Sequence, residues 1–524
     1  MASFLAVAVE LETMGICWDE PEGYFRGSEI LREWLNHSFQ KIKNGEPFSI
    51  FEPSFHRTYW PITEVDSLNQ VIFNDHPPIP RILPTITWYL FHNWLGEITA
   101  YRLSSACLFA GTITITFLLT APHFGFLVGL FASLALLLSP RFFGHAHFVA
   151  TDIPLTAFWT FSVFAFYKGL TNCRWSYLFA IALGLTWSVK FTAFMICGTF
   201  ILYYFLTQDR RVFNNFKHAL WLSPLILWGL NPTWWTDPTA IYYNFIKIHF
   251  SLDQILIPTY YLGTSYQFDV PWHYGFILTL ITLPLPILLT SLVGLASSWN
   301  QIWRPGIFSL FWMQLIIFYG TLTFPITPGY DGVRLFLPVF PFLACFAGLG
   351  FKKITSWLEN RIPSFIEKLR ENGKEKFQAG LMAVILLPLS WQLILISPFY
   401  LEYYNSLVGG PRGAAKLGFE TTYWLDTLSK DVRDDINQLP DHSKIGVIPG
   451  YYSYYHNLQR RGLFKKKLYF TPNNPDFVLI IPRQGKFDSF AWDLYKNKDP
   501  IYSAKLNGEP IALVYRINQI SFKP

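Results

Sequence analysis

Charged residues are scarce in this chain of 524 residues. They make up 15% of it, whereas hydrophobic residues make up 51% and aromatic residues 19%. An average globular domain carries about 25% charged residues. This shortage argues against a soluble protein and favours one whose surface largely faces lipid.

Cysteine and concentrated basic charge are also in short supply. The cysteines are few, odd in number and widely scattered, so no disulfide framework is indicated: Cys17, Cys107, Cys173, Cys197 and Cys345. The net charge of +6 is modest and forms no patch, which excludes a nucleic-acid partner. No internal repeat of fixed period is visible, which argues against a transporter built from paired halves.

Long apolar runs are abundant. A helix needs roughly 20 apolar residues to cross a bilayer core, and ten ranges approach or reach that length: 99–121, 124–140, 153–170, 175–189, 191–207, 218–231, 273–297, 307–326, 334–351 and 379–398. The opening "MASFLAVAVELETMGIC" predicts the remaining part of a clipped first helix, or alternatively a short re-entrant or interfacial helix. The sequence therefore predicts an all-α polytopic membrane protein with about 11 transmembrane helices.

Basic residues in short loops predict which way these helices run, because cytoplasmic loops are enriched in Lys and Arg. Three basic clusters lie at 168–174, 210–217 and 351–378, and we place them in the cytoplasm. The other connections then face outward: 18–81, 141–152, 231–272, 327–334 and the tail from about 400. Within the first loop, "PEGYFRGSEILREWL" predicts a helix in the interface plane. The prolines and Arg81 of 78–96 favour a helix lying at the outer surface over one that spans.

The pattern changes in the last quarter of the chain. "KIGVIPG", "DFVLIIP", "PIYSAKL" and "PIALVYRIN" are typical of strands, and helices are predicted at 421–438 and 487–496. We therefore expect two domains: a transmembrane region, 1–400, and a small extramembrane α/β domain, 401–524.

Polar residues gather at the predicted outer ends of the spans. They are Asp19, Glu20, Asp75, His76, His145, His147, Asp152, Lys190, Asp331 and Arg334. A charge near membrane depth is costly and suggests function. Simpler roles exist for most of them. Asp19, Glu20 or Asp152 could cap a helix, Asp75 could form a turn, the histidines could lie at the interface, and Lys190 and Arg334 could reach headgroups.

Carboxylates beside cations at a membrane surface suit group transfer from a lipid-linked phosphate. A carboxylate can take a proton from an incoming hydroxyl, while cations hold a phosphate that leaves with growing negative charge. Substitution at a sugar carbon passes through an oxocarbenium-like state that a nearby carboxylate also stabilises. The polar set therefore predicts sugar transfer.

The chain from 17 to about 520 resembles a known superfamily. Its motifs include "WDEPEGYFRGSE", "NDHPPIPRIL", "SPRFFGHAHFVATDIPLTAF", "LGLTWSVKFTAF", "GYDGVRLFLPVF" and "YYNSLVGGPRGAAKLGFETTYW". As a set they resemble the polyprenyl-phosphate-dependent membrane glycosyltransferases of the GT-C fold. This superfamily includes the protein O-mannosyltransferases and the lipid A aminoarabinose transferases, and the chain looks closest to its bacterial branch.

The resemblance implies a role for each matching residue. Asp19 matches the catalytic carboxylate, with Glu20 beside it, and Asp152 matches a second acid. The implied donor-phosphate residues are His76, Arg81, Lys190 and Arg334, and His145, His147 and Asp331 are further candidates. A divalent metal beside Asp19, Glu20 and Asp152 is compatible with the family, although some relatives need none.

The sequence thus predicts an inverting, mannosyltransferase-like enzyme in the bacterial cytoplasmic (inner) membrane. It would move a hexosyl or pentosyl group from a polyprenyl phosphate to a hydroxyl of a protein, lipid or glycan at the outer face, as in protein O-linked glycosylation. Two alternatives remain: a secondary transporter, and a glycan ligase or polymerase that uses a polyprenyl-diphosphate donor. The missing repeat, the long first outer loop and the α/β tail argue against the transporter.

Overall fold

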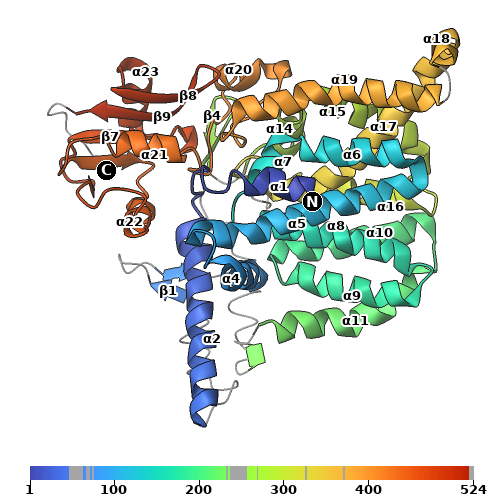
Figure 1. The fold of residues 1–524 in the computed structure, drawn as a ribbon, viewed down its shortest axis with the longest axis horizontal. Helices are drawn as coiled ribbons and strands as arrows, with labels where there is room; N and C mark the ends of the chain where they lie inside the picture. The colour runs from blue at the N-terminus through green and yellow to red at the C-terminus, as the bar shows by residue number, and fades with distance from the viewer. Residues whose placement is uncertain are drawn as a thin grey trace.

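A bundle of helices with a small sheet unit at one end makes up the structure (Figure 1). The structure is a computed structural model that describes residues 1–46, 63–65, 71–73, 76–231, 234–235, 257–267, 269–324, 327, 329–369 and 372–517. Asp75 and most of the predicted outer loop 231–272 lie outside the described residues.

Every one of the ten apolar ranges coincides with a helix or with two consecutive helices. They are α5 (Glu97–Phe124), α6 (Phe126–Leu137), α8 (Asp152–Gly169), α9 (Cys173–Trp187), η2 (Phe191–Phe194) with α10 (Met195–Thr207), α11 (Val212–Gly229), α14 (Tyr274–Thr282) with α15 (Leu285–Ser298), α16 (Ile307–Leu322), η6 (Arg334–Val339) with α17 (Phe340–Arg361), and α19 (Gly373–Ile396). The helical prediction is confirmed at this level.

Three helices are long and apolar enough to cross a membrane, judged by length and composition: Glu97–Phe124, Arg334–Arg361 and Gly373–Ile396. Shorter apolar helices cover Phe126–Leu137, Phe191–Thr207 and Ile307–Thr321. The count of 11 membrane-spanning helices therefore stays a prediction.

Helix α17 lies at the centre of the bundle, packed most closely against α15. Small residues make this approach possible. A Cβ at Gly294 would lie 1.9 Å from the Phe346 carbonyl oxygen, and one at Gly350 would lie 1.8 Å from that of Thr290. Glycine is required at both positions, as it is where membrane helices touch through their backbones.

The N-terminal part crosses the end of the bundle. Helix α1 (Ala2–Ala8) packs beside α5, and the chain then reaches a π-helical turn, η1 (Glu20–Phe25), which continues as α2 (Arg26–Asn44). Helix α2 runs across the bundle helices (Figure 1) and exposes Phe39 and Ile42 near its end, as expected of a helix in the interface plane.

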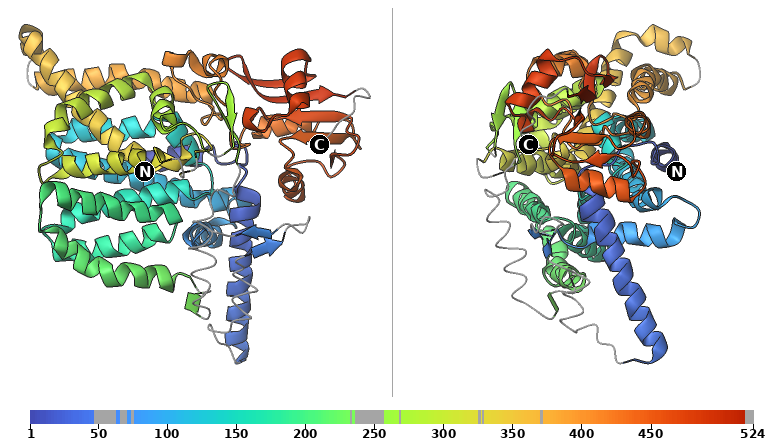
Figure 2. Two further views of the ribbon diagram at one scale, coloured as in Figure 1. Left: turned by 180° about the vertical axis from the view of Figure 1, so that it is seen from behind. Right: turned by 90° about the vertical axis from the view of Figure 1, so that its left-hand side faces the viewer.

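Helix α4 (Ile79–Phe91) covers the ambiguous stretch 78–96. At 1.5 Å per residue its 13 residues extend about 20 Å, too short for a bilayer core of about 30 Å. It lies transverse to α5 (Figures 1 and 2). Both features favour the predicted surface helix.

The C-terminal unit contains a five-stranded sheet with the order β6-β5-β7-β9-β8. Its strands are β5 (Lys444–Ile448), β6 (Tyr469–Phe470), β7 (Phe477–Ile480), β8 (Tyr502–Leu506) and β9 (Glu509–Arg516), with β5 parallel to β6 and β7. Helices α20 (Gly410–Lys416), α21 (Lys430–Ile436), α22 (Tyr452–Arg460) and α23 (Ser489–Asn497) complete it. The predicted α/β character is confirmed, and the boundary at 401 remains a proposal.

Several connections meet at the end of the bundle that carries this sheet. They are α7 (Pro140–His145), the hairpin of β3 (Thr259–Tyr261) and β4 (Thr264–Tyr266), and η6. The basic segment around α18 (Pro363–Lys368) lies at the opposite end (Figure 1). This arrangement agrees with the predicted orientation, while the assignment of inner and outer sides stays a prediction.

Candidate functional site

Arg334 lies at the centre of a cluster of three carboxylates. Its Nη2 donates to Asp19 Oδ2 at 2.7 Å, its Nε to Asp152 Oδ2 at 3.2 Å, and its Nη1 to Asp331 Oδ2 at 2.8 Å. The Arg334 side chain is only 6% exposed. The structure thus joins four of the predicted site residues, and the buried Arg334 does not reach out to headgroups.

Local backbone geometry places these side chains. Asp331 and Gly332 both adopt left-handed conformations, with φ of +54° and +64°, so the chain turns sharply before η6 begins at Arg334. Asp152 is the first residue of α8, and Asp19 directly precedes η1. Asp19 makes no capping hydrogen bond to that helix, because its carboxylate is turned toward Arg334.

The C-terminal region supplies two further residues that the sequence did not reveal as site residues. Trp424 donates its indole N–H to Asp19 Oδ2 at 3.1 Å, and the Arg334 guanidinium lies 4.3 Å from the centre of its ring. Arg483 Nη2 donates to Asp331 Oδ1 at 2.6 Å. The cluster is therefore shared between the bundle and the C-terminal unit.

Glu20 lies beside Asp19 in sequence but is completely buried. Arg102 of α5 grips it with two hydrogen bonds, Nε to Oε1 at 2.8 Å and Nη2 to Oε2 at 2.6 Å. The backbone N–H groups of Cys17 and Val149 donate to the same carboxylate. Arg102 was missed in the sequence, although a lone cation inside the apolar run 99–121 is a signal for such a buried partner.

Further polar groups surround Asp152. The charge of Lys190 acts on its carboxylate in addition to that of Arg334, and the imidazoles of His145 and His76 lie near it. Lys190 lies between α9 and η2, where two short helices were expected to meet. Burial lowers the pKa of His145 to about 3, so this imidazole is neutral at physiological pH. Its Nε2 lies 3.4 Å from the Tyr423 hydroxyl.

Two other predicted residues have different surroundings. His147 is buried, its Nδ1 lies 3.0 Å from the Phe143 carbonyl oxygen, and its ring stacks on Tyr400. Arg81 is buried in α4 with its side chain against Gly27 of α2, so a Cβ on that glycine would lie 2.6 Å from it. These are packing contacts, and a part for either residue in the site stays a prediction.

The proposed metal ligands do not fit a metal ion. The residues that the structure describes contain no group of three or more His, Cys, Asp or Glu side chains that could hold one. The Glu20 carboxylate already accepts hydrogen bonds from Arg102 and from backbone N–H groups. The carboxylates of Asp19 and Asp152 accept hydrogen bonds from Arg334.

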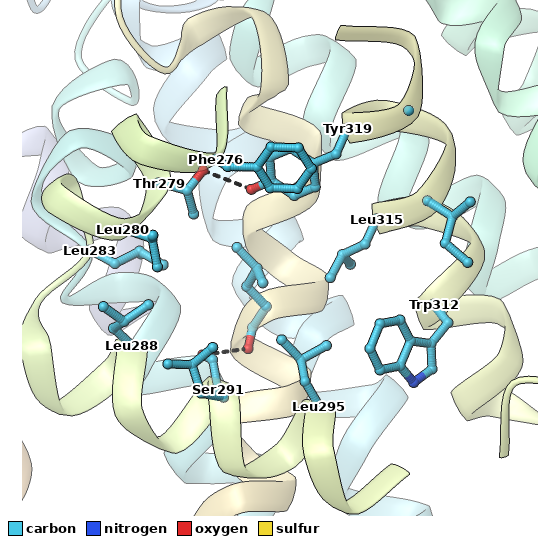
Figure 3. A pocket seen from close by; sticks show the side chains of 14 residues that line it. Phe276, Thr279, Leu280, Leu283, Leu288, Ser291, Leu295, Trp312, Leu315 and Tyr319 are labelled. Carbon is cyan, nitrogen blue, oxygen red and sulfur yellow. Dashed lines mark hydrogen bonds between the residues drawn. The ribbon is translucent and has the colours of Figure 1, made fainter. Parts of the chain in front are cut away.

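An apolar cavity of about 470 Å³ lies between α14, α15, α16 and α17 (Figure 3). Its lining includes the partly exposed Leu280, Leu292 and Ile316, so it faces the outside of the bundle. At one end the Tyr319 hydroxyl and Thr279 Oγ1 are hydrogen-bonded at 2.7 Å. The centre of the Tyr319 ring lies 6.1 Å from the centre of the ring of Phe336, a residue of η6 two positions after Arg334.

The arrangement of the helices is similar to that of known enzymes. The oligosaccharyltransferase of Archaeoglobus fulgidus, solved with a tethered acceptor peptide containing the NVT sequon, is 12% identical with a TM-score of 0.50. The match covers 88% of this chain and 62% of that one. ArnT from Cupriavidus metallidurans, solved with undecaprenyl phosphate, is 16% identical with a TM-score of 0.47 over 98% and 97% of the two chains. No curated protein matches the sequence.

The chain therefore has the GT-C fold of these membrane proteins. At the level of sequence, the family model described as dolichyl-phosphate-mannose-protein mannosyltransferase matches residues 75–235, a range that contains His76, Asp152 and Lys190. The resemblance to polyprenyl-phosphate-dependent enzymes that was predicted from the motifs is confirmed, whereas the bacterial branch stays a prediction.

Proposed function

We propose that this protein transfers one sugar from a polyprenyl phosphate to an acceptor hydroxyl, with inversion at the anomeric carbon and with Asp19 as the base. The observation that carries the proposal is an accessible carboxylate held by the buried Arg334, in a bundle that also has an apolar cavity facing the outside. A lipid-linked phosphate donor needs both features.

Asp19 is the carboxylate of the cluster that an acceptor can reach. Its side chain is 24% exposed, compared with 2% for Asp152 and 5% for Asp331. Its Oδ2 accepts from Arg334 and Trp424, while no hydrogen bond from the described residues reaches Oδ1. Oδ1 can therefore accept the proton of an incoming hydroxyl.

The cations serve the leaving group. In a single displacement the acceptor oxygen bonds to the anomeric carbon as the bond from that carbon to the phosphate oxygen breaks. The hydroxyl proton passes to Asp19, and the bonding electrons leave with the polyprenyl phosphate. Arg334, Lys190 and His76 stabilise the negative charge that the phosphate gains. Asp152 and Asp331 accept hydrogen bonds from Arg334 and hold its guanidinium group in place during the transfer.

The apolar cavity suits the first isoprene units of the donor. Its walls are almost entirely leucine, isoleucine and aromatic side chains. Tyr319 in its wall contacts Phe336 of η6, the helix that begins at Arg334. A lipid chain lying there keeps its phosphate at the end of the bundle where Asp19 and Arg334 lie. The acceptor then approaches from the outer side of the membrane, next to the C-terminal unit.

A reconstitution assay tests the proposal. Purified protein in liposomes is given labelled polyprenyl phosphates that carry mannose, another hexose or a pentose, together with hydroxyl acceptors of the protein, lipid and glycan classes. We expect transfer with an inverted anomeric configuration and none with Asp19→Asn. Movement of intact donor across the bilayer without transfer would instead indicate a transporter, and use of diphosphate donors alone would indicate a ligase or polymerase.

A further inference from the structure

Two further carboxylates, Glu402 and Asp426, are buried in the C-terminal part of the chain. Glu402 follows α19, and Asp426 lies between α20 and α21; their exposures are 0% and 2%. The two side chains are within hydrogen-bonding reach of each other. Each carboxylate lies near its own backbone N–H, and no other side chain of the described residues forms a hydrogen bond with any of the four carboxylate oxygens. Among the described residues, the only side-chain hydrogen bond available to the pair is one in which a proton carried by one carboxyl group is accepted by the other.

The charges around the pair favour one negative charge rather than two. Arg141 of α7 is the cation that faces both carboxylates, and it is itself buried between Tyr404 and Tyr423. On the other side Glu20 adds negative charge at Asp426. Burial raises the pKa of Glu402 and of Asp426, because a carboxylate loses its hydration there, and the charge of Asp426 raises the pKa of Glu402 further.

The segment that carries Asp426 also positions the proposed base. Trp424 donates to Asp19, and the Trp18 backbone N–H donates to the Trp424 carbonyl oxygen at 2.8 Å. The Asp426 carbonyl lies so close to Gly15 that a Cβ there would be 1.8 Å from its oxygen. A displacement of Asp426 is therefore transmitted to both sides of Asp19.

We propose that Glu402 and Asp426 share a single proton, and that this shared proton holds Trp424 in its hydrogen bond with Asp19. The two acids are positioning residues, since they act on the acceptor's proton only through Trp424 and Asp19. When the shared proton is lost, the two carboxylates repel each other, the 424–426 segment shifts, and Asp19 loses its orientation.

The test combines two substitutions with a matched control. In Glu402→Gln the amide donates permanently to Asp426 and keeps one negative charge opposite Arg141. Asp426→Asn makes the reciprocal exchange, so either variant serves if the other fails to fold. Glu509→Gln is the control, because Glu509 is also a buried carboxylate but accepts a hydrogen bond from the Tyr495 hydroxyl in the sheet unit.

Three measurements are made across a pH series: the infrared C=O stretch of protonated carboxyl groups, the melting temperature in detergent and the transfer rate. An acid whose pKa is raised on folding stabilises the protein at low pH, and this stability is lost as the pH rises through the folded pKa. We expect the wild-type melting temperature to follow this course. The wild-type rate should fall about tenfold for each pH unit above that pKa.

In Glu402→Gln the infrared band of the pair should be missing, and both the thermal and the kinetic decline at alkaline pH should be flattened. Glu509→Gln should retain the kinetic decline. A variant that keeps the wild-type band and the wild-type pH profile would overturn the proposal. The kinetic measurement depends on the proposed function, but the infrared and thermal measurements do not. If no donor is ever used, they still decide whether the proton is shared.

Discussion

Asp19 and Glu20 are neighbours in sequence with opposite surroundings, and single substitutions separate their roles. Asp19→Asn keeps the size of the side chain, and its amide oxygen can still accept from Trp424. It cannot take a proton, so we expect transfer to fall by roughly 10²–10⁴-fold. Donor binding and melting temperature should stay close to those of the wild type. Single-turnover rates and a thermal scan check this, and a fully active Asp19→Asn protein would remove Asp19 from the mechanism.

Glu20→Gln should instead unfold the protein. Removal of one partner from a buried ion pair costs roughly 3–5 kcal/mol, because the other charge is left uncompensated, and Arg102 is the partner here. We expect a large drop in melting temperature, with the surviving protein still able to transfer. A stable but inactive Glu20→Gln protein would mean that Glu20 takes part in the chemistry.

Glu420 provides a prediction for the dependence of stability on pH. Burial raises its pKa to about 7, although the charge of Arg483 opposes this shift. A raised carboxyl pKa gives stability that is present at acidic pH and lost as the pH rises through about 7. The melting temperature of Glu420→Gln should therefore fall less than that of the wild type between weakly acidic and weakly alkaline pH. An unchanged slope would show that Glu420 does not titrate in this range.

At the scale of helices, the apolar cavity can be filled without disturbing the fold. Gly320 of α16 lines it, and a Cβ at that position would meet nothing within 4 Å. A tryptophan side chain there should displace part of the donor's lipid chain from the cavity. If about two methylene groups of that chain are no longer buried, the donor should bind roughly tenfold more weakly. We expect Gly320→Trp to raise the KM for the donor with little change in kcat.

Gly111 of α5 gives the matched control, because it is also a helical glycine with open space around its Cβ but lies outside the cavity. Gly111→Trp should leave the donor KM unchanged. Equal effects of the two substitutions would mean that the cavity does not hold the donor.

The helices themselves were largely predictable, because each depends on a continuous apolar run. The break at Lys190 was visible for the same reason, since a cation interrupts the run where α9 gives way to η2. Short elements that mix polar and apolar residues were not predicted from the sequence. Strand β6 has only two residues, and the nine residues of α22 are mostly tyrosines and polar residues, with Leu458 as its one aliphatic residue.

At the scale of the whole molecule, the basic connections and the C-terminal sheet should lie on opposite sides of the membrane. A reporter fused after Lys368 should be cytoplasmic, and one fused to the end of the chain should be outside. Protease protection in sealed vesicles provides a second measurement. Reporters on the same side would mean that α19 does not cross, and the outward position of the sheet would be wrong.

The structure brings together four predicted residues that stand out as polar against apolar surroundings, Asp19, Asp152, Asp331 and Arg334, and their role in a site stays a prediction. Trp424 and Arg483 could not be found in this way. They lie in a region of ordinary composition, and only the packing of the sheet unit against the bundle brings them to Asp19 and Asp331. The burial of Glu20 was hidden for a similar reason, because its partner Arg102 is 82 residues away.

The contribution of Trp424 and Arg483 has a consequence for biosynthesis. A ribosome delivers Asp19 and Asp152 to the membrane long before these two residues leave the exit tunnel, and Arg334 emerges in between. Until the C-terminal unit folds, Asp331 lacks its second arginine and Asp19 lacks the indole that orients it. The cluster is thus completed last, so an unfinished chain enters the membrane before the contacts of Asp19 and Asp331 with the C-terminal unit have formed.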